Sequence, residues 1–131
     1  MVPVAALGAL LYTLAEYWYH RYIAHQWLDR HMLETHHAVP DNYFAAPWPL
    51  IVPVAALLWL AAFAWLGTSG ATAFMVGVSA CHLWQELVHF IAHHVQIYWS
   101  LALHHNMHHY DETRNFGHST TLWDHVFNTK A

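Results

Sequence analysis

Residues 81–127 read CHLWQELVHFIAHHVQIYWSLALHHNMHHYDETRNFGHSTTLWDHVF, and this stretch decides the fold. Ten of the chain's 15 histidines lie in it, and none lies between residues 38 and 81. The remaining histidines form one earlier cluster, namely His20, His25, His31, His36 and His37. Two histidine-rich regions separated by an apolar stretch predict one metal centre that is assembled from both regions.

The spacing of the histidines supports this prediction. Residues four apart on a helix share a face, so His89 and His93 point the same way, and His82 and Glu86 extend their stripe. Neutral imidazole binds iron, zinc, copper and nickel. The 15 imidazoles far exceed the ligands of a single zinc site. The count favours two metal ions, or one ion with many histidines that orient its ligands.

The composition indicates one membrane-embedded domain, residues 1–131. The chain is 57% hydrophobic and only 9% charged, whereas soluble proteins are ~25% charged. The net charge is −4 and the sequence has no run of basic residues. It therefore lacks the positively charged surface that binding of nucleic acid requires. Cys81 is the only cysteine, which excludes an internal disulfide.

The hydrophobic segments predict about three membrane-spanning helices with shorter interfacial helices. Residues 2–19 are expected to be a retained span rather than a signal peptide, because no basic residue precedes them and no cleavage site follows. Glu16 near the end of this span is costly in lipid unless it faces protein or metal. The other two spans are expected at 50–66 and 71–94, joined by a tight GTSG turn.

The polar regions complete this topology. Residues 20–49 are expected to be helical at first and then a loop, and residues 95–103 to lie at the membrane interface. With three spans, all four basic residues (Arg21, Arg30, Arg114 and Lys130) and both histidine clusters fall on one side. The positive-inside rule makes that side cytoplasmic. The predicted fold is therefore an all-α integral membrane bundle with a di-metal site facing the cytoplasm, in a bacterial inner membrane.

Five segments, in order, resemble the fatty acid hydroxylase superfamily, the membrane di-metal family that includes sterol desaturases and fatty acid 2-hydroxylases. They are EYWYHRYIAH (16–25), THHAVP (35–40), ELVHFIAHH (86–94), HNMHH (105–109) and RNFGHSTTLWDHVFNT (114–129). The last segment is the most specific of them. Histidine boxes alone are less specific, because acyl desaturases and alkane hydroxylases also carry them in other patterns.

The resemblance implies nine metal ligands and no catalytic residue beyond them. They are His20, His25, His36, His37, His89, His93, His105, His108 and His109. One family histidine is replaced by Leu33, so His31 or Glu34 takes its place or one metal lacks a ligand. Further candidates for ligands, or for groups that orient ligands, are His31, Glu34, His82, Glu86, His118 and Asp124. His118 and His125 stand where the family more usually has an apolar residue and an arginine.

The resemblance also implies a di-iron oxygenase that hydroxylates or desaturates a lipid, such as a fatty acyl chain, a sterol or a carotenoid. A lipid C–H bond has no acidic proton, so its oxidation needs O2 and a redox metal, although the same ligands would hold zinc. No flavin, haem or iron–sulfur motif is visible. Electrons are therefore expected from a separate reductase or carrier protein that docks near residues 105–124.

Two groups of side chains near the histidines have open roles. The aromatic residues Trp18, Trp84, Phe90, Tyr98 and Trp99 line a lipid route, or else pack and form an interfacial belt. The carboxylates of Asp111, Glu112 and Asp124 orient imidazoles, or else cap helices.

Three other functions fit parts of the pattern. The main alternative is a non-catalytic zinc-binding subunit of a larger membrane complex, which the short chain and Leu33 favour. A carboxylate-rich di-iron bundle would use Glu34-x-x-His37 and Glu86-x-x-His89, but only Glu16 is well placed to add a carboxylate. A metal transporter is disfavoured because the histidines cluster on one side. The sequence leaves open the lipid, the reaction type, the metal, the electron donor and the oligomeric state.

Overall fold

The structure is a computed structural model that describes residues 1–28, 48–95 and 98–131. Within these ranges helix is the only regular secondary structure. The helices are α1 (Val2–Trp18), η1 (Tyr19–Leu28), α3 (Trp48–His94), α4 (Ser100–Tyr110) and α5 (Leu122–Val126). The prediction of an all-α fold is confirmed.

Helix α1 continues without interruption into η1, so the predicted helix over residues 2–19 and the helical start of residues 20–49 are both present. Pro3 lies in the first turn of α1, where a proline costs no hydrogen bond. The winding changes at Tyr19, because η1 is a π-helix. This change sets the spacing of two histidines in the site described below.

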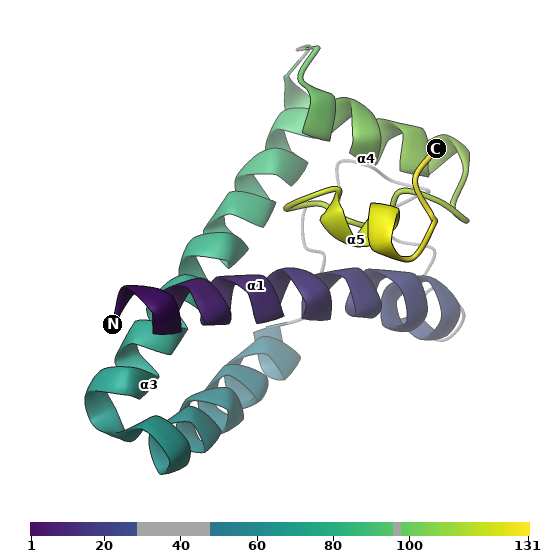
Figure 1. Ribbon diagram of the computed structural model, residues 1–131. Coiled ribbons are helices and arrows are strands. Elements are labelled where there is room, and N and C mark those ends of the chain that lie inside the picture. Colours follow the sequence, from purple (N-terminus) through teal and green to yellow (C-terminus); the bar gives the residue numbers. More distant parts are fainter. Residues whose placement is uncertain (29–47, 96–97) are drawn as a thin grey trace.

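Helix α3 consists of two arms that meet at Gly67, where φ is 66° and ψ is −179°. Only glycine adopts this conformation without strain, and the two arms diverge from the bend as a V (Figure 1). The bend confirms the predicted break between the second and third spans, although only Gly67 of the GTSG turn leaves the helical conformation.

One described stretch, Val52–His94, is long and apolar enough to cross a membrane. Only 6% of an 18-residue apolar segment within this stretch is buried inside the protein. Its apolar side chains therefore face outward, as in a membrane helix rather than in the core of a soluble protein. The count of three membrane spans is not confirmed, because α1 is 17 residues long and the two arms of α3 form one continuous element.

Helix α1 crosses α3 with backbone against backbone (Figure 1). A Cβ atom at Gly77 would lie 1.9 Å from the carbonyl oxygen of Ala5, and one at Gly8 would lie 2.2 Å from that of Phe74. Neither position has room for a side chain. Small residues at such a crossing allow the close packing that holds helices together in an apolar environment.

The C-terminal segment with α5 lies between α1 and α4 (Figure 1). It is tied to α1 by hydrogen bonds from Trp123 Nε1 to Thr13 Oγ1 (3.0 Å) and between the hydroxyls of Tyr17 and Thr129 (2.9 Å). The segment predicted to lie at the interface, residues 95–103, ends inside α4, which begins at Ser100. The fold brings His20 and His25 close to the histidines of α3, α4 and the loop before α5.

Candidate metal centre

The first group of converging histidines is His20, His25 and His108, whose ligand atoms lie within 4.8 Å of one another. His25 Nε2 is 2.9 Å from His20 Nε2 and 2.8 Å from His108 Nε2. On an α-helix, residues five apart point in different directions. The i→i+5 winding of the π-helix η1 instead aligns His20 with His25.

Backbone carbonyls fix the proton positions of two of these rings. Nδ1 of His20 donates to the carbonyl oxygen of Phe116 (2.6 Å), and Nδ1 of His108 donates to that of Arg114 (2.6 Å). Burial and the nearby histidines, His118 foremost, lower the pKa of His20 well below its usual value, so its ring is neutral. With Nδ1 protonated, Nε2 keeps its lone pair for a metal.

Two further groups share one residue. His93, His105 and His109 form one of them, with Nε2 of His105 lying 2.9 Å from that of His93 and 3.1 Å from that of His109. His105 also belongs to a fully buried group with His89 and His118. Burial and neighbouring histidines lower the pKa of His105 well below its usual value, which keeps this ring neutral as well.

His118 joins the first group to the others. Its ring centroid lies 4.3 Å from that of His20 and 4.4 Å from that of His105. Its position is set by Glu16 at the end of α1, whose Oε1 accepts the backbone N–H of His118 (2.6 Å) and that of Ser119 (3.0 Å). The Ser119 hydroxyl donates to the other oxygen of Glu16. Glu16 thus faces protein, as its place in an apolar helix required.

A second buried carboxylate, Asp124 of α5, holds the preceding loop. It accepts hydrogen bonds from the backbone N–H groups of Phe116 (2.8 Å) and Gly117 (2.9 Å) and from the hydroxyl of Thr129 (2.8 Å). Nε2 of His104 lies 2.9 Å from Asp124 Oδ2. Burial alone would raise the pKa of Asp124, but these hydrogen bonds lower it below its usual value. The loop that carries His118 is therefore fixed from both sides.

The donor set fits metal ions better than it fits hydrogen bonds. In the first group, the lone pairs of His20 Nε2 and His108 Nε2 both face His25 Nε2. A single proton on His25 Nε2 could form a hydrogen bond with only one of them. A metal ion would satisfy all three nitrogens. Two nitrogens bound at 2.0–2.1 Å at right angles lie about 3 Å apart, which matches the observed separations of 2.8–3.1 Å.

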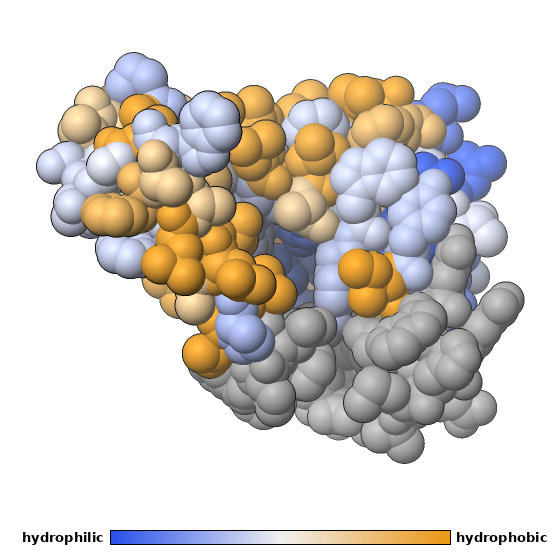
Figure 2. Space-filling view, turned by 90° about the horizontal axis from the view of Figure 1, so that it is seen from below, coloured by the Kyte–Doolittle hydropathy of each residue, from blue (hydrophilic) through white to orange (hydrophobic). Residues whose placement is uncertain are grey.

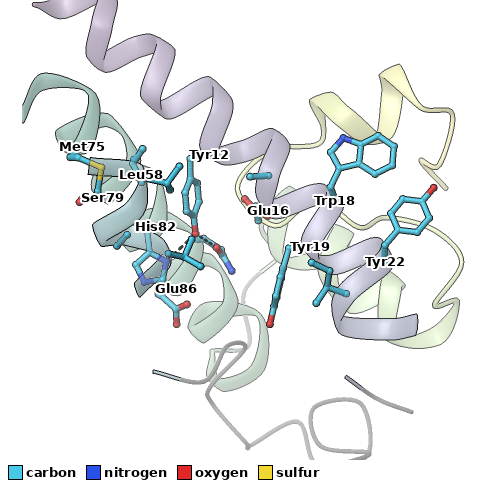
Figure 3. Close-up of a pocket in the computed structure, with 16 residues that line it drawn as sticks. Tyr12, Glu16, Trp18, Tyr19, Tyr22, Leu58, Met75, Ser79, His82 and Glu86 are labelled. Atoms are coloured by element: carbon cyan, nitrogen blue, oxygen red, sulfur yellow. Dashed lines mark hydrogen bonds between the residues drawn. The ribbon is translucent and has the colours of Figure 1, made fainter. Parts of the chain in front are cut away.

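A cavity of about 750 Å³ lies beside the histidines, between α1 with η1 and both arms of α3 (Figure 3). Its walls are mainly apolar and aromatic, with Trp18, Tyr22, Val54, Leu58, Met75 and Val78 among them. Glu16 and Glu86 also line it. Glu16 contacts the backbone of His118, and Glu86 precedes His89 by one helical turn, so the cavity approaches the histidine groups. Figure 2 shows a hollow between hydrophobic and hydrophilic surfaces of the molecule.

The structure brings together seven of the predicted ligands and adds His118 to them. They are His20, His25, His89, His93, His105, His108 and His109. His82 and Glu86 line the cavity and are not in the three groups, and Asp124 binds His104 and the loop backbone. The predicted residues His31, Glu34, His36 and His37 lie outside the described residues.

Two contributors were not anticipated from the sequence. Tyr12 hydrogen-bonds to His82 and Gln85 across the cavity wall, and Ser119 binds Glu16 beside His118. A polar residue within an apolar helix was the available signal for Tyr12, but nothing in the sequence indicates its partners.

Comparisons with known proteins agree with this geometry. The sequence profile described as "Fatty acid hydroxylase" matches residues 5–129. Two dihydroceramide fatty acyl 2-hydroxylases of Arabidopsis thaliana are similar, FAH2 with 28% identity over 96% of this chain and FAH1 with 26% identity over 98%. The solved structure described as full-length scs7p, in which only the hydroxylase domain is visible, matches 99% of the chain with a TM-score of 0.84 and 27% identity.

These relatives are longer than the chain. The match covers 60% of FAH2, 61% of FAH1 and 56% of the scs7p chain. The similarity therefore concerns the helical domain that contains the histidine groups.

Proposed function

Because the chain belongs to the fatty acid hydroxylase family, we propose that it hydroxylates a lipid at a pair of iron ions. In this reaction a C–H bond becomes C–OH, and O2 supplies the oxygen atom. Two electrons and two protons convert the second oxygen atom to water. The names of the relatives favour hydroxylation over desaturation.

The observation that carries this proposal is the set of converging histidine groups beside an apolar cavity. His20, His25 and His108 would hold one ion, and His93, His105 and His109 the other, with His89 and His118 close by. His36 and His37 are proposed to complete the set. When bound, iron supplies the redox chemistry that cleaving an unactivated C–H bond requires. The carbonyls of Phe116 and Arg114 orient the rings, and the cavity walls hold the lipid away from water.

The proposed setting is a membrane with the histidine groups on the cytoplasmic side, since the basic residues favour that side. A separate reductase or carrier protein would supply the electrons. We place its docking surface at the exposed end of α4 and the turn after it, where Tyr110 is 88% exposed. The substitutions Tyr110→Ala and Glu112→Lys should lower turnover driven by the reductase. They should leave turnover unchanged when dithionite supplies the electrons chemically. An equal loss in both assays would overturn this placement.

The first test is the identity and number of metal ions in protein purified without a metal-affinity step. The proposal expects two irons per chain, and loss of at least one ion in His105→Ala, because His105 belongs to two groups. His125→Ala is the matched control, since the His125 side chain is exposed and, within the described part of the chain, hydrogen-bonds to Lys130 and belongs to none of the three histidine groups. Turnover of dihydroceramide with 18O2 should then label the product.

Other outcomes would change the conclusion. Zinc that is retained after attempted iron loading, without any turnover, would support the non-catalytic subunit. A protein that binds no metal under any condition would overturn both proposals.

A further inference from the structure

Three polar side chains meet on the wall of the mainly apolar cavity. Tyr12 comes from α1 and His82 from the second arm of α3 (Figure 3). Gln85 follows His82 by three residues on the same arm. The Tyr12 hydroxyl donates to Gln85 Oε1 and lies 2.9 Å from His82 Nδ1. We call these three residues the Tyr12 triad. None of them belongs to the histidine groups, so the metal centre does not account for them.

The hydrogen-bond pattern leaves two groups of the triad available. The single proton of the Tyr12 hydroxyl is given to Gln85, so His82 Nδ1 must donate to the Tyr12 oxygen. In the neutral ring, His82 Nε2 then keeps a lone pair. Within the described part of the chain, no hydrogen bond reaches His82 Nε2 or the side-chain nitrogen of Gln85. The cavity wall therefore offers one acceptor beside one donor.

Polar groups in an apolar site cost free energy unless they find partners. A hydroxyl group suits this pair, because it donates to His82 Nε2 and accepts from the Gln85 amide. An anionic group does not suit it. None of the described residues that line the cavity is a lysine or an arginine, whereas Glu16 and Glu86 both line it.

We propose that the Tyr12 triad binds the hydroxyl group of an uncharged, otherwise apolar lipid and thereby selects the substrate. The role of this lipid as a substrate rests on the proposed function, whereas its binding does not. His82 precedes His89 by seven residues on α3, which is roughly 10 Å along the helix. The C–H bond presented to the histidine groups would therefore lie several carbons from the hydroxyl group.

The test measures binding without turnover. Purified protein in nanodiscs is equilibrated with radiolabelled hexadecan-1-ol, hexadecane or hexadecanoate, and the bound fraction is expressed relative to ligand dissolved in empty nanodiscs. The wild-type protein should retain hexadecan-1-ol about three- to tenfold better than hexadecane, as expected for one or two added hydrogen bonds. It should also retain hexadecanoate at least threefold less well than hexadecan-1-ol.

Variants assign this preference to the triad. Tyr12→Phe and His82→Leu should bring the ratio of alcohol to hydrocarbon close to one while hexadecane binding persists. Tyr22→Phe is the matched control, because it removes a tyrosine hydroxyl from the same cavity outside the triad, and it should keep the wild-type ratio.

Three results would overturn the inference. The first is equal retention of alcohol and hydrocarbon by the wild-type protein. The second is retention of hexadecanoate as strong as that of the alcohol. The third is that Tyr12→Phe and the more conservative His82→Gln lose binding of all three ligands equally, while their circular dichroism spectra stay unchanged. That result would make the triad a structural link between helices. Because no metal or O2 is needed, failure here is distinguishable from failure of the proposed hydroxylation.

Discussion

Helix α1 is held in two different ways along its length. Where it crosses α3, the backbone at Gly8 and Gly77 lies directly against the other helix. At the histidine end, Thr13, Glu16 and Tyr17 are bound by hydrogen bonds to the C-terminal segment. The crossing depends on the absence of side chains and the histidine end on their presence. The two regions should therefore respond to substitution in different ways.

The largest effect is expected at the crossing. Gly77→Val adds a Cβ that would lie 1.9 Å from the carbonyl oxygen of Ala5 and 2.8 Å from its carbon, and backbone atoms cannot yield as side chains do. We expect the helices to separate and the variant to yield no monodisperse protein in size-exclusion chromatography. Val76→Leu is the control, because Val76 is 59% exposed on the same turn. A well-folded Gly77→Val protein would show that the crossing is not tightly packed.

The next effect is expected at the histidine end. Asp124→Asn removes the charge of a fully buried carboxylate that binds two backbone amides, Thr129 and His104. We expect a loss of about 3 kcal/mol in the free energy of unfolding, because hydrogen bonds to charged groups are the strong ones. Thermal unfolding in detergent would measure it. Asp111→Asn, at a half-exposed carboxylate, should have little effect.

The stability difference between the wild type and Asp124→Asn should depend on pH, and this dependence is a more specific test. The folded-state pKa of Asp124 lies below 3.8, so the charged carboxylate stabilises the fold above its unfolded pKa. That stabilisation is lost as the pH falls through the folded-state pKa. The gap in stability between wild type and Asp124→Asn should be constant above about pH 5 and should close below pH 3.8. If the stability difference instead disappeared between pH 7 and pH 5, where histidines titrate, the effect would be assigned to a histidine.

The smallest effect is expected where α3 meets the histidine end. Trp84 Nε1 donates to the carbonyl oxygen of Ser119 (3.1 Å), one residue after His118. Trp84→Phe should lower the free energy of unfolding by about 1 kcal/mol, the value of one hydrogen bond. It should leave bound metal unchanged, because Glu16 still holds the same loop. Loss of metal from this variant would show that the loop needs α3 as much as α1.

Local features of the fold were predictable from the sequence. The apolar runs predicted the helices, and the break between the arms of α3 follows from glycine at position 67. The i, i+4 spacing of His89 and His93 placed both on one face of α3, where both now lie near His105. Each of these inferences depends on residues that are close in the chain.

Contacts between distant residues were not predictable. Tyr12 and His82 are 70 residues apart, and Glu16 and Ser119 are 103 apart. A helical period shows which residues share a face but does not show which faces meet. His118 lies in a loop without any period, so its place between His20 and His105 needed the folded chain. The π-helical winding that aligns His20 with His25 also has no clear signal in the sequence.

The hydrogen bond between the hydroxyls of Tyr17 and Thr129 joins residues 112 positions apart, and this separation has a consequence for biosynthesis. During translation, α1 and both arms of α3 leave the ribosome well before the segment that carries Asp124 and Thr129. The apolar helices are therefore able to enter the bilayer and cross one another while the histidines remain apart. The histidine groups come together only when the segment that carries Asp124 and Thr129 docks beside α1. A nascent chain stalled before residue 115 should thus be inserted in the membrane and unable to retain metal.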